Sequence, residues 1–232
     1  MKRRLWIALT LIAVAAVVWL FRPRQRTLPP KPRTVADVLA SIGPAVDGRL
    51  RPYFRKAGVA YPPPKLAVLA FKKEKRVELY GADEAGEFRF VRAYPILGAS
   101  GTDGRKRREG DRQVPEGFYR VELLNSNSSF HLSLRVDYPN AEDLALARAE
   151  GRDLSTLGGD IMIHGGSGSS GCLAMGDEVA EDFFVMAART GLDRIELVFC
   201  PWDLREQGAS ATAGDDLYQR LEKSLGRFSG SR

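Results

Sequence analysis

The stretch IHGGSGSSGCLAM, residues 163–175 of this 232-residue chain, contains a histidine and a cysteine separated by a run of glycine and serine. Its apolar start predicts a strand that delivers His164 to a loop of glycine and serine. Cys172 ends that loop, and apolar residues at helical spacing predict a helix over about Asp177–Thr190. A strand, a tight loop and a helix are therefore expected to bring one imidazole and one thiol together.

A cysteine close to a histidine can serve as a nucleophile, because the thiolate is the reactive form and a base or a positive dipole favours it. The helix expected after Cys172 would supply a positive N-terminus, and its backbone N–H groups could stabilise an oxyanion. Residue types alone equally allow a structural interpretation. In that case His164 is a hydrogen-bonded loop residue and Cys172 is a small buried side chain.

Other chemistries have little support in the sequence. The histidines at 131 and 164 and the cysteines at 172 and 200 give no close pair of metal ligands, so we expect no metal and no other cofactor. No Gly-Lys-Ser or Gly-Lys-Thr follows the glycines, which excludes a common phosphate-binding loop. Cys200 ends an apolar run and is expected in the core, without a disulfide to Cys172.

Outward from this stretch, the chain consists of short apolar runs bounded by turn-forming residues. We expect strands at 66–71, 76–80, 88–97, 118–124, 131–136, 160–164 and 194–199. Thr34 predicts the start of a helix that Gly43-Pro44 interrupts, a second helix follows through Phe54, and a short amphipathic helix lies near the C-terminus. Many short strands with few helices predict a mainly β, sandwich-like or barrel-like domain with flanking helices.

The motif Ile163-His164-Gly165, followed by Ser169-Ser170-Gly171-Cys172, resembles the active-site signature of the YkuD-type L,D-transpeptidases. The ending Cys172-Leu173-Ala174-Met175 resembles the YafK-like subgroup in particular. Further segments similar to that subgroup are EGDRQVPEGFY (109–119), FHLS (130–133) and YPNA (138–141). The resemblance spans about Leu66–Trp202 and implies a YkuD-like β-sandwich catalytic domain.

The resemblance also implies roles for single residues. The family's nucleophile falls on Cys172 and its general base on His164. Its small hydroxyl residue falls on Ser169, and by analogy the N–H groups of Gly171 and Cys172 are oxyanion donors. Ser170 stands where the more typical Ser-His-Gly-Cys motif has a second histidine, so the oxyanion and orienting roles are less defined than the pair itself.

Three further residues are candidates for substrate binding: His131, Arg112 and Gly165. His131 is expected on a strand, where a structural role competes with substrate contact. Asp111 and Arg112 are also candidates for holding their loop. The basic run Arg105–Arg108 is a solvated loop or a contact for a carboxylate-bearing peptide.

The implied reaction starts with attack of Cys172 on the carbonyl of the diamino acid at position 3 of a peptidoglycan stem peptide, which gives an acyl-enzyme thioester. An amine acceptor completes a transpeptidation, and water completes a hydrolysis. The YafK-like subgroup includes enzymes resembling amidases that release a covalently attached lipoprotein from the wall. A non-catalytic peptidoglycan-binding module and a cysteine peptidase of ordinary proteins are the alternatives of other classes.

The N-terminal segment predicts a membrane anchor. Leu5–Phe21 contains one polar residue, Thr10, and would extend about 25 Å as a helix. A cleaved signal peptide is the alternative, with Ala13-Val14-Ala15 as its cleavage site. We expect an anchor over 1–26, a proline-rich spacer with a helical lead-in over 27–64, the catalytic domain over 65–205 and a tail over 206–232. The implied chemistry requires the domain in the periplasm, on the outer side of the inner membrane.

The net charge of +6 comes from the predicted anchor and not from the rest of the chain. Residues 1–26 hold six of the 35 basic residues and no acidic one, which leaves 29 basic residues against 29 acidic ones in the rest of the chain. The body is therefore neutral, and no nucleic-acid partner is expected.

Overall fold

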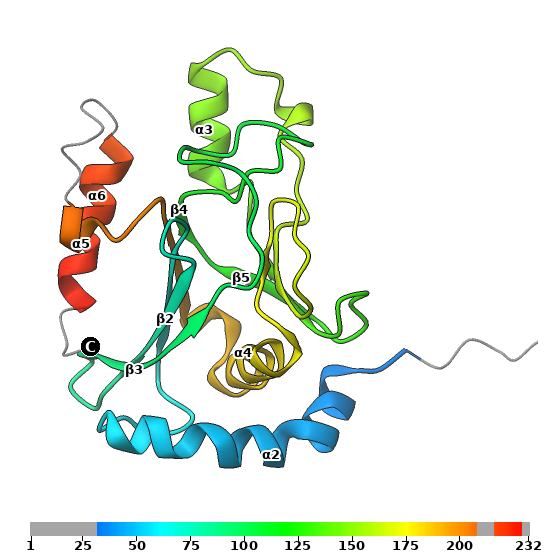
Figure 1. Cartoon of the computed structure of the whole chain (residues 1–232), viewed down its shortest axis with the longest axis vertical. Helices are drawn as coiled ribbons and strands as arrows, with labels where there is room; N and C mark the ends of the chain where they lie inside the picture. Colours follow the sequence, from blue (N-terminus) through cyan, green and yellow to red (C-terminus); the bar gives the residue numbers. More distant parts are fainter. Residues whose placement is uncertain (1–31, 208–215, 229–232) are drawn as a thin grey trace, which may run out of the picture. The chain divides into compact units, whose positions relative to one another are not determined.

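Two mixed β-sheets and the helices around them share a central core in the computed structural model (Figure 1). The five-stranded sheet has the order β3 (Phe88–Pro95), β2 (Arg76–Ala82), β1 (Leu66–Phe71), β9 (Ile195–Cys200) and β4 (Gly117–Tyr119). The four-stranded sheet has the order β5 (Val121–Asn125), β6 (Ser133–Val136), β7 (Met162–His164) and β8 (Leu173–Ala174). Each sheet contains one parallel pair, β1 with β9 and β7 with β8.

The structure describes residues 32–207 and 216–228. Their helices are α2 (Val35–Lys56), α3 (Ala141–Ala149), α4 (Asp177–Thr190), α5 (Leu204–Gln207) and α6 (Asp216–Leu225), with short 3₁₀ turns at Leu154–Thr156, Leu192–Arg194 and Gly226–Phe228. None of these described helices is both long and apolar enough to cross a membrane. The predicted anchor over 1–26 and the first residues of the predicted spacer lie outside the described residues.

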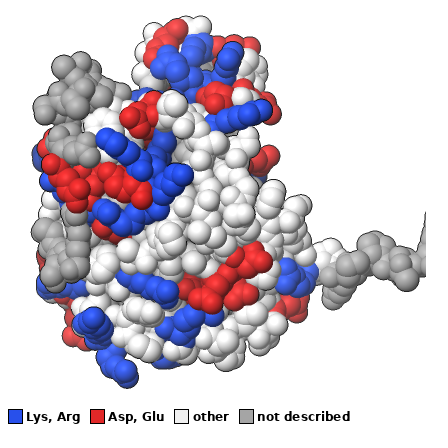
Figure 2. Space-filling model, viewed as in Figure 1, with Lys and Arg blue, Asp and Glu red and all other residues white. Residues whose placement is uncertain are grey.

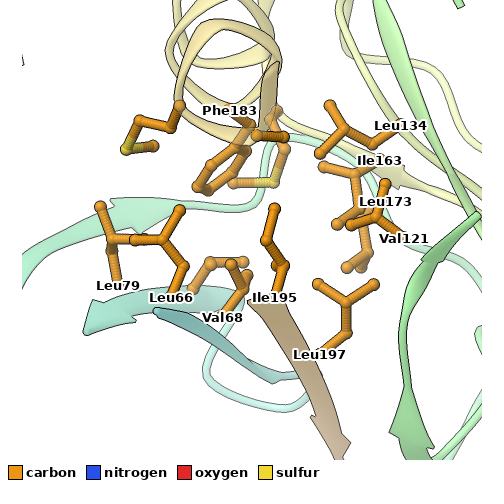
Figure 3. Close-up of a cluster of buried hydrophobic side chains, with 14 of the residues drawn as sticks. Leu66, Val68, Leu79, Val121, Leu134, Ile163, Leu173, Phe183, Ile195 and Leu197 are labelled. Atoms are coloured by element: carbon orange, nitrogen blue, oxygen red, sulfur yellow. The ribbon is translucent and has the colours of Figure 1, made fainter. Parts of the chain in front are cut away.

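The main core lies between the two sheets and α4 (Figure 3). Strand residues alternate, so that one side of each sheet supplies apolar side chains to this core. Those labelled in Figure 3 are Leu66, Val68, Leu79, Ile195 and Leu197 from the five-stranded sheet, Val121, Leu134, Ile163 and Leu173 from the four-stranded sheet, and Phe183 from α4. The predicted β-sheets with flanking helices are confirmed, and both sheets are mixed. The domain is not mainly β, because more of the described residues lie in helices than in strands.

A second, smaller core covers the other side of the five-stranded sheet. Every residue of β1 is buried, although Ala67, Leu69 and Phe71 point away from the main core. These three side chains pack in the second core instead. Residues 216–228 provide that cover. Their buried side chains are Leu217, Tyr218, Leu221, Leu225 and Phe228. The amphipathic helix predicted near the C-terminus is therefore confirmed, and it packs against the sheet.

The helix that begins after Thr34 does not break where the sequence suggested. Thr34 forms a capping box with Asp37, but α2 continues through Pro44 and Pro52 to Lys56. Gly43 allows α2 to pack closely on α4 because it has no side chain. A Cβ at this position would lie 3.0 Å from Nη2 of Arg189 on α4. The break expected at Gly43-Pro44 is wrong because close packing of α2 on α4 outweighs the cost of an internal proline.

The predicted strands are confirmed with shifted ends. The run 118–124 is divided into β4 and β5, and the run 131–136 becomes a strand only from Ser133. Helix α3 was not predicted, although Asn140 and Asp143 form a capping box at its start. The short strand β8, which directly follows Cys172, was not predicted either.

Candidate active site

The base candidate His164 ends β7, and the nucleophile candidate Cys172 directly precedes the neighbouring strand β8 of the four-stranded sheet. In the parallel pairing of β7 with β8, Ile163 faces Leu173 and His164 faces Ala174. Ile163 and Leu173 point into the main core. Because side chains alternate along a strand, His164 and Cys172 point to the opposite, outer face, two register positions apart. Within the described residues, no hydrogen bond joins the Cys172 thiol to the His164 ring.

The thiol of Cys172 is half-buried and held by backbone groups. The N–H of Met162 donates to Sγ over 3.4 Å, and the thiol donates to the carbonyl oxygen of Asp160 over 3.7 Å. Burial raises the pKa of the Cys172 thiol, and the Met162 N–H and the charge of Lys106 offset this only in part. The thiol is therefore protonated at neutral pH in the free protein, and the attack needs a base.

The expected helix N-terminus next to Cys172 is wrong. Strand β8 separates Cys172 from α4, which begins at Asp177. The first residue of α4 instead contacts the loop that follows His164, since the Gly166 N–H donates to Oδ1 of Asp177 over 2.8 Å. The helix dipole, which falls off within the first turn, thus acts near the His164 loop.

The imidazole of His164 has one nitrogen fixed. Nδ1 lies 2.6 Å from the carbonyl oxygen of Gly165, and a carbonyl can only accept, so Nδ1 carries the proton. In the neutral ring, Nε2 is then the basic nitrogen. The ring is buried, with 3% of the residue exposed, and the Phe130 ring lies over it at a centroid distance of 4.7 Å. His164 is thus oriented as a base by its own following residue.

Gly165 allows this arrangement by having no side chain. A Cβ there would lie 2.5 Å from Oδ1 of Asp177 and 2.6 Å from the carbonyl oxygen of Phe130. Its N–H donates to the carbonyls of Phe130 and Leu132. The structure therefore places Gly165 directly beside the base, and its predicted role in substrate binding stays a prediction.

The predicted oxyanion donors are hydrogen-bonded in this structure. The N–H of Gly171 donates to Oγ of Ser100 over 2.7 Å, and the N–H of Cys172 donates to Oγ of Ser169 over 3.0 Å. The Ser169 hydroxyl in turn donates to the carbonyl of Cys172, which suits its predicted orienting role. Ser170 is exposed. Both N–H groups can receive a substrate oxygen only if the serine hydroxyls move.

Ser100 was missed by the sequence analysis, yet it links two loops beside the nucleophile. Its hydroxyl donates to the carbonyl of Arg112 over 2.7 Å while accepting from Gly171. Arg112 has a left-handed backbone with φ of 56°, and its side chain is exposed. The structure thus places Arg112 within the loop that contacts Gly171, as its predicted loop-holding and substrate-binding roles both require. The turn-forming residues on both sides of Ser100, in the segment 98–104, were the available signal.

Asp111 organises the same loop. It accepts hydrogen bonds from Lys106 Nζ and from the N–H groups of Arg107, Arg108 and Gln113. Burial alone would raise the pKa of Asp111, but these donors lower it to about 2. The predicted loop-holding role of Asp111 is confirmed.

The three arginines of the basic run Arg105–Arg108 line a cavity of about 510 Å³ together with Tyr218 of α6. Three of its charges have acidic partners. Lys106 pairs with Asp111, Arg105 with Glu142 on α3, and Arg107 with Glu150 just after α3. Around this region Figure 2 shows basic and acidic side chains interleaved over the surface. Contact with a carboxylate-bearing peptide at this run stays a prediction.

His131 lies in a loop and not on a strand, because β6 starts at Ser133. Its φ of 69° is left-handed, which the ladder of a strand does not accommodate. Nε2 of His131 lies 2.9 Å from Oε1 of Glu181 on α4. This pairing matches the structural role that competed with substrate contact.

Both cysteines are free thiols, and Cys200 is fully buried in the second core as predicted. Within residues 32–207 and 216–228, no group of three or more His, Cys, Asp or Glu side chains could hold a metal ion.

A family model described as the L,D-transpeptidase catalytic domain, YkuD, matches residues 67–196. The chain belongs to this family. The matched residues cover more than half of the chain and include both His164 and Cys172. The predicted recognition of a YkuD-type domain is confirmed.

Individual relatives agree with that membership. A segment of 116 residues is 34% identical to YafK of Escherichia coli (strain K12), whose assignment as an L,D-transpeptidase is provisional. The match takes in 49% of this chain and 44% of YafK, so the chain spans less than half the length of this relative.

Solved structures show more distant likeness. The helical cell shape determining protein Pgp2 from Campylobacter jejuni is 24% identical with a TM-score of 0.47, over 60% of this chain and 48% of Pgp2. Bd1075 of Bdellovibrio bacteriovorus is 15% identical with a TM-score of 0.43, over 74% of this chain and 58% of Bd1075.

Proposed function

We propose that this YkuD-family protein is a peptidoglycan L,D-transpeptidase that works through an acyl-enzyme thioester on Cys172. The observation that carries the proposal is the pair on the outer face of β7 and β8, where His164 has Nδ1 fixed by the Gly165 carbonyl and Nε2 left basic. A binding module without chemistry would need neither group.

The proposed mechanism follows from the protonation states. Because burial raises the pKa of the thiol, Nε2 of His164 takes its proton as sulfur attacks the stem-peptide carbonyl. The tetrahedral oxyanion is stabilised by the N–H groups of Gly171 and Cys172, released from Ser100 and Ser169. Collapse expels the terminal residue of the stem as an amine, which takes the proton from His164. Catalytic contacts commonly tighten only when substrate is bound, which fits the missing thiol–imidazole hydrogen bond.

The acceptor determines the product. A second stem peptide attacks the thioester through its amine, passes a proton to His164 and regenerates the thiol, giving a cross-link. Water in the same position gives a carboxylic acid, and the protein then acts as an amidase, for example on a wall-attached lipoprotein. Both reactions use the same two side chains.

The test is an incubation of the full chain with muropeptides that carry tetrapeptide stems, read by mass spectrometry. Loss of the terminal residue with gain of a second stem identifies the transpeptidase. A shortened stem without a cross-link identifies the hydrolase. The Cys172→Ala and His164→Ala variants must lose both products, and wild-type protein that gives neither product contradicts the proposal.

We also propose that the chain is anchored in the inner membrane with this domain in the periplasm, since stem peptides are found there. The predicted anchor within residues 1–26 supports attachment to the membrane. Three basic residues lie on each side of its apolar run, so the proposed chemistry rather than the charge sets the orientation. A reporter enzyme fused to the C-terminus should be active only on the periplasmic side. Activity of a cytoplasm-specific reporter contradicts the proposal.

A further inference from the structure

An exposed aromatic side chain covers the candidate base. Phe130 lies in the β5–β6 loop (residues 126–132), and its ring is tilted by 34° over the His164 ring. The imidazole residue is 3% exposed, whereas Phe130 is 53% exposed. Few large apolar side chains of the described surface are that open. Phe130 thus shields His164 from water on one side and shows its other side to solvent.

The backbone around Phe130 is joined directly to the base. The Gly165 N–H donates to the carbonyl of Phe130 over 3.0 Å, while the Gly165 carbonyl binds Nδ1 of His164. One residue therefore fixes both the imidazole and the aromatic ring above it. A displacement of the β5–β6 loop would move the ring relative to the base.

Both ends of the β5–β6 loop are held by Arg33, which precedes α2. Nη2 of Arg33 donates to the carbonyls of Ser126 and His131, over 2.7 and 3.5 Å. Asn127 bonds the Arg33 backbone in both directions, accepting from its N–H over 2.9 Å and donating to its carbonyl over 2.8 Å. The loop is thus clamped by a residue more than 90 positions earlier in the chain.

The position of Phe130 bears on which acceptor reaches the thioester. Any acceptor must give its proton to His164 and so must pass next to Phe130. The hydrocarbon part of an amine-bearing side chain is stabilised by contact with an exposed aromatic ring, whereas water gains nothing from an apolar surface. A ring that covers the imidazole also reduces the number of waters that the base can activate.

We propose that Phe130 is a specificity-determining residue that favours an amine acceptor with an apolar chain over water, and that Arg33 and Asn127 position it. This inference rests on the proposed acyl-enzyme mechanism. In the favoured branch the amine nitrogen bonds to the acyl carbon, the C–S bond breaks, and the amine proton passes through His164 to sulfur. In the other branch the oxygen of water takes the place of the amine nitrogen.

The experiment measures the ratio of hydrolysed stem to cross-linked stem formed by the full chain with tetrapeptide muropeptides. Phe130→Ala should raise this ratio by roughly two- to tenfold, the size expected for loss of one aromatic contact. Phe130→Tyr keeps a ring and should restore the wild-type ratio. Tyr53→Ala removes another exposed aromatic, on α2 beside Arg92, and should leave the ratio unchanged.

The positioning role of Arg33 and Asn127 is tested by the same product ratio. Arg33→Ala and Asn127→Ala should shift the ratio in the same direction by a smaller factor. The double variant of Arg33→Ala with Phe130→Ala should show no more than the Phe130→Ala effect, because both act through one ring. Arg148→Ala, an exposed arginine on α3, is the matched control.

Two results overturn the inference while leaving the proposed function standing. One is an unchanged ratio in Phe130→Ala, and the other is wild-type protein that only hydrolyses, both with product formation still dependent on Cys172. Products that persist in Cys172→Ala overturn the proposed function instead.

Discussion

The two sheets of this domain differ in how their outer faces are covered. The outer face of the five-stranded sheet lies under residues 216–228, and its central strand β1 has no exposed residue. The outer face of the four-stranded sheet holds Cys172 and His164 and is approached by loops, among them the one that carries Phe130. One sheet is closed by packing and the other is left accessible for chemistry.

This difference separates stability from reactivity within one fold. The second core also contains buried charges that are fully paired, since Arg205 bonds Glu78 and Asp203, both almost completely buried. The catalytic face instead uses backbone hydrogen bonds from short loops, which can rearrange when substrate binds. Variants in the two regions should therefore change different measurements.

The largest expected effect is on the catalytic face. Cys172→Ala should reduce formation of both products by about 10⁴-fold or more, because it removes the nucleophile. The thermal midpoint of unfolding should stay within a few degrees of wild type. A combined loss of activity and of stability would show that Cys172 is a structural residue.

The matched variant lies in the other core. Cys200→Ala should keep its activity at temperatures where the protein is folded and lower the free energy of unfolding by about 1 kcal/mol, because a fully buried thiol leaves a small cavity. Loss of activity in the folded Cys200→Ala protein would contradict the separation of the two regions.

The next effect is on stability alone. Arg205→Ala removes one of the two arginines that pair with the buried carboxylates of Glu78 and Asp203. Arg76 still contacts both carboxylates, so the variant should cost about 2 kcal/mol in urea denaturation. Arg89→Ala breaks an exposed pair with Asp83 and should cost less than about 1 kcal/mol. Equal costs for the two variants would remove the argument for a closed, tightly paired outer face.

A glycine on the catalytic face gives a sharper contrast. Gly165→Ala places a Cβ against the Phe130 carbonyl and Asp177 and should lower activity by about 10²-fold through displacement of His164. Gly168→Ala lies in the same loop, and a Cβ there would meet nothing within 4 Å, so its activity should match wild type. Comparable activity of both variants would contradict the proposed orientation of the base.

The smallest effect concerns pH. Because burial raises the pKa of the Cys172 thiol, its alkylation by iodoacetamide in the Cys200→Ala background should accelerate with a midpoint at higher pH in the folded chain than in urea. A raised folded pKa stabilises the fold below the unfolded pKa, and this contribution is lost as pH rises through the folded value. A folded midpoint below the one in urea would indicate an activated thiolate at rest.

Local patterns predicted much of this structure. Helix α4 and strand β1 match their expected bounds, since helical spacing and an apolar run between turn residues are properties of neighbouring residues. The motif around His164 and Cys172 also stood out by composition. The family resemblance then placed both residues in one site.

What the sequence did not predict depends on contacts between distant residues. Continuity of α2 past Pro44 depends on its packing against α4, and the bond between Ser100 and Gly171 joins residues 71 positions apart. The clamp between Arg33 and Asn127 spans 94 positions. No local pattern marks such pairs, because the residues become neighbours only after the sheets have formed.

The order of strands in the five-stranded sheet also constrains when the site can form. Strand β9 lies between β1 and β4, so the sheet stays divided until residues 195–200 have been made. Residues 216–228, which cover its outer face, are made later still. The nucleophile at position 172 is therefore synthesised before the strand that joins the two parts of the five-stranded sheet.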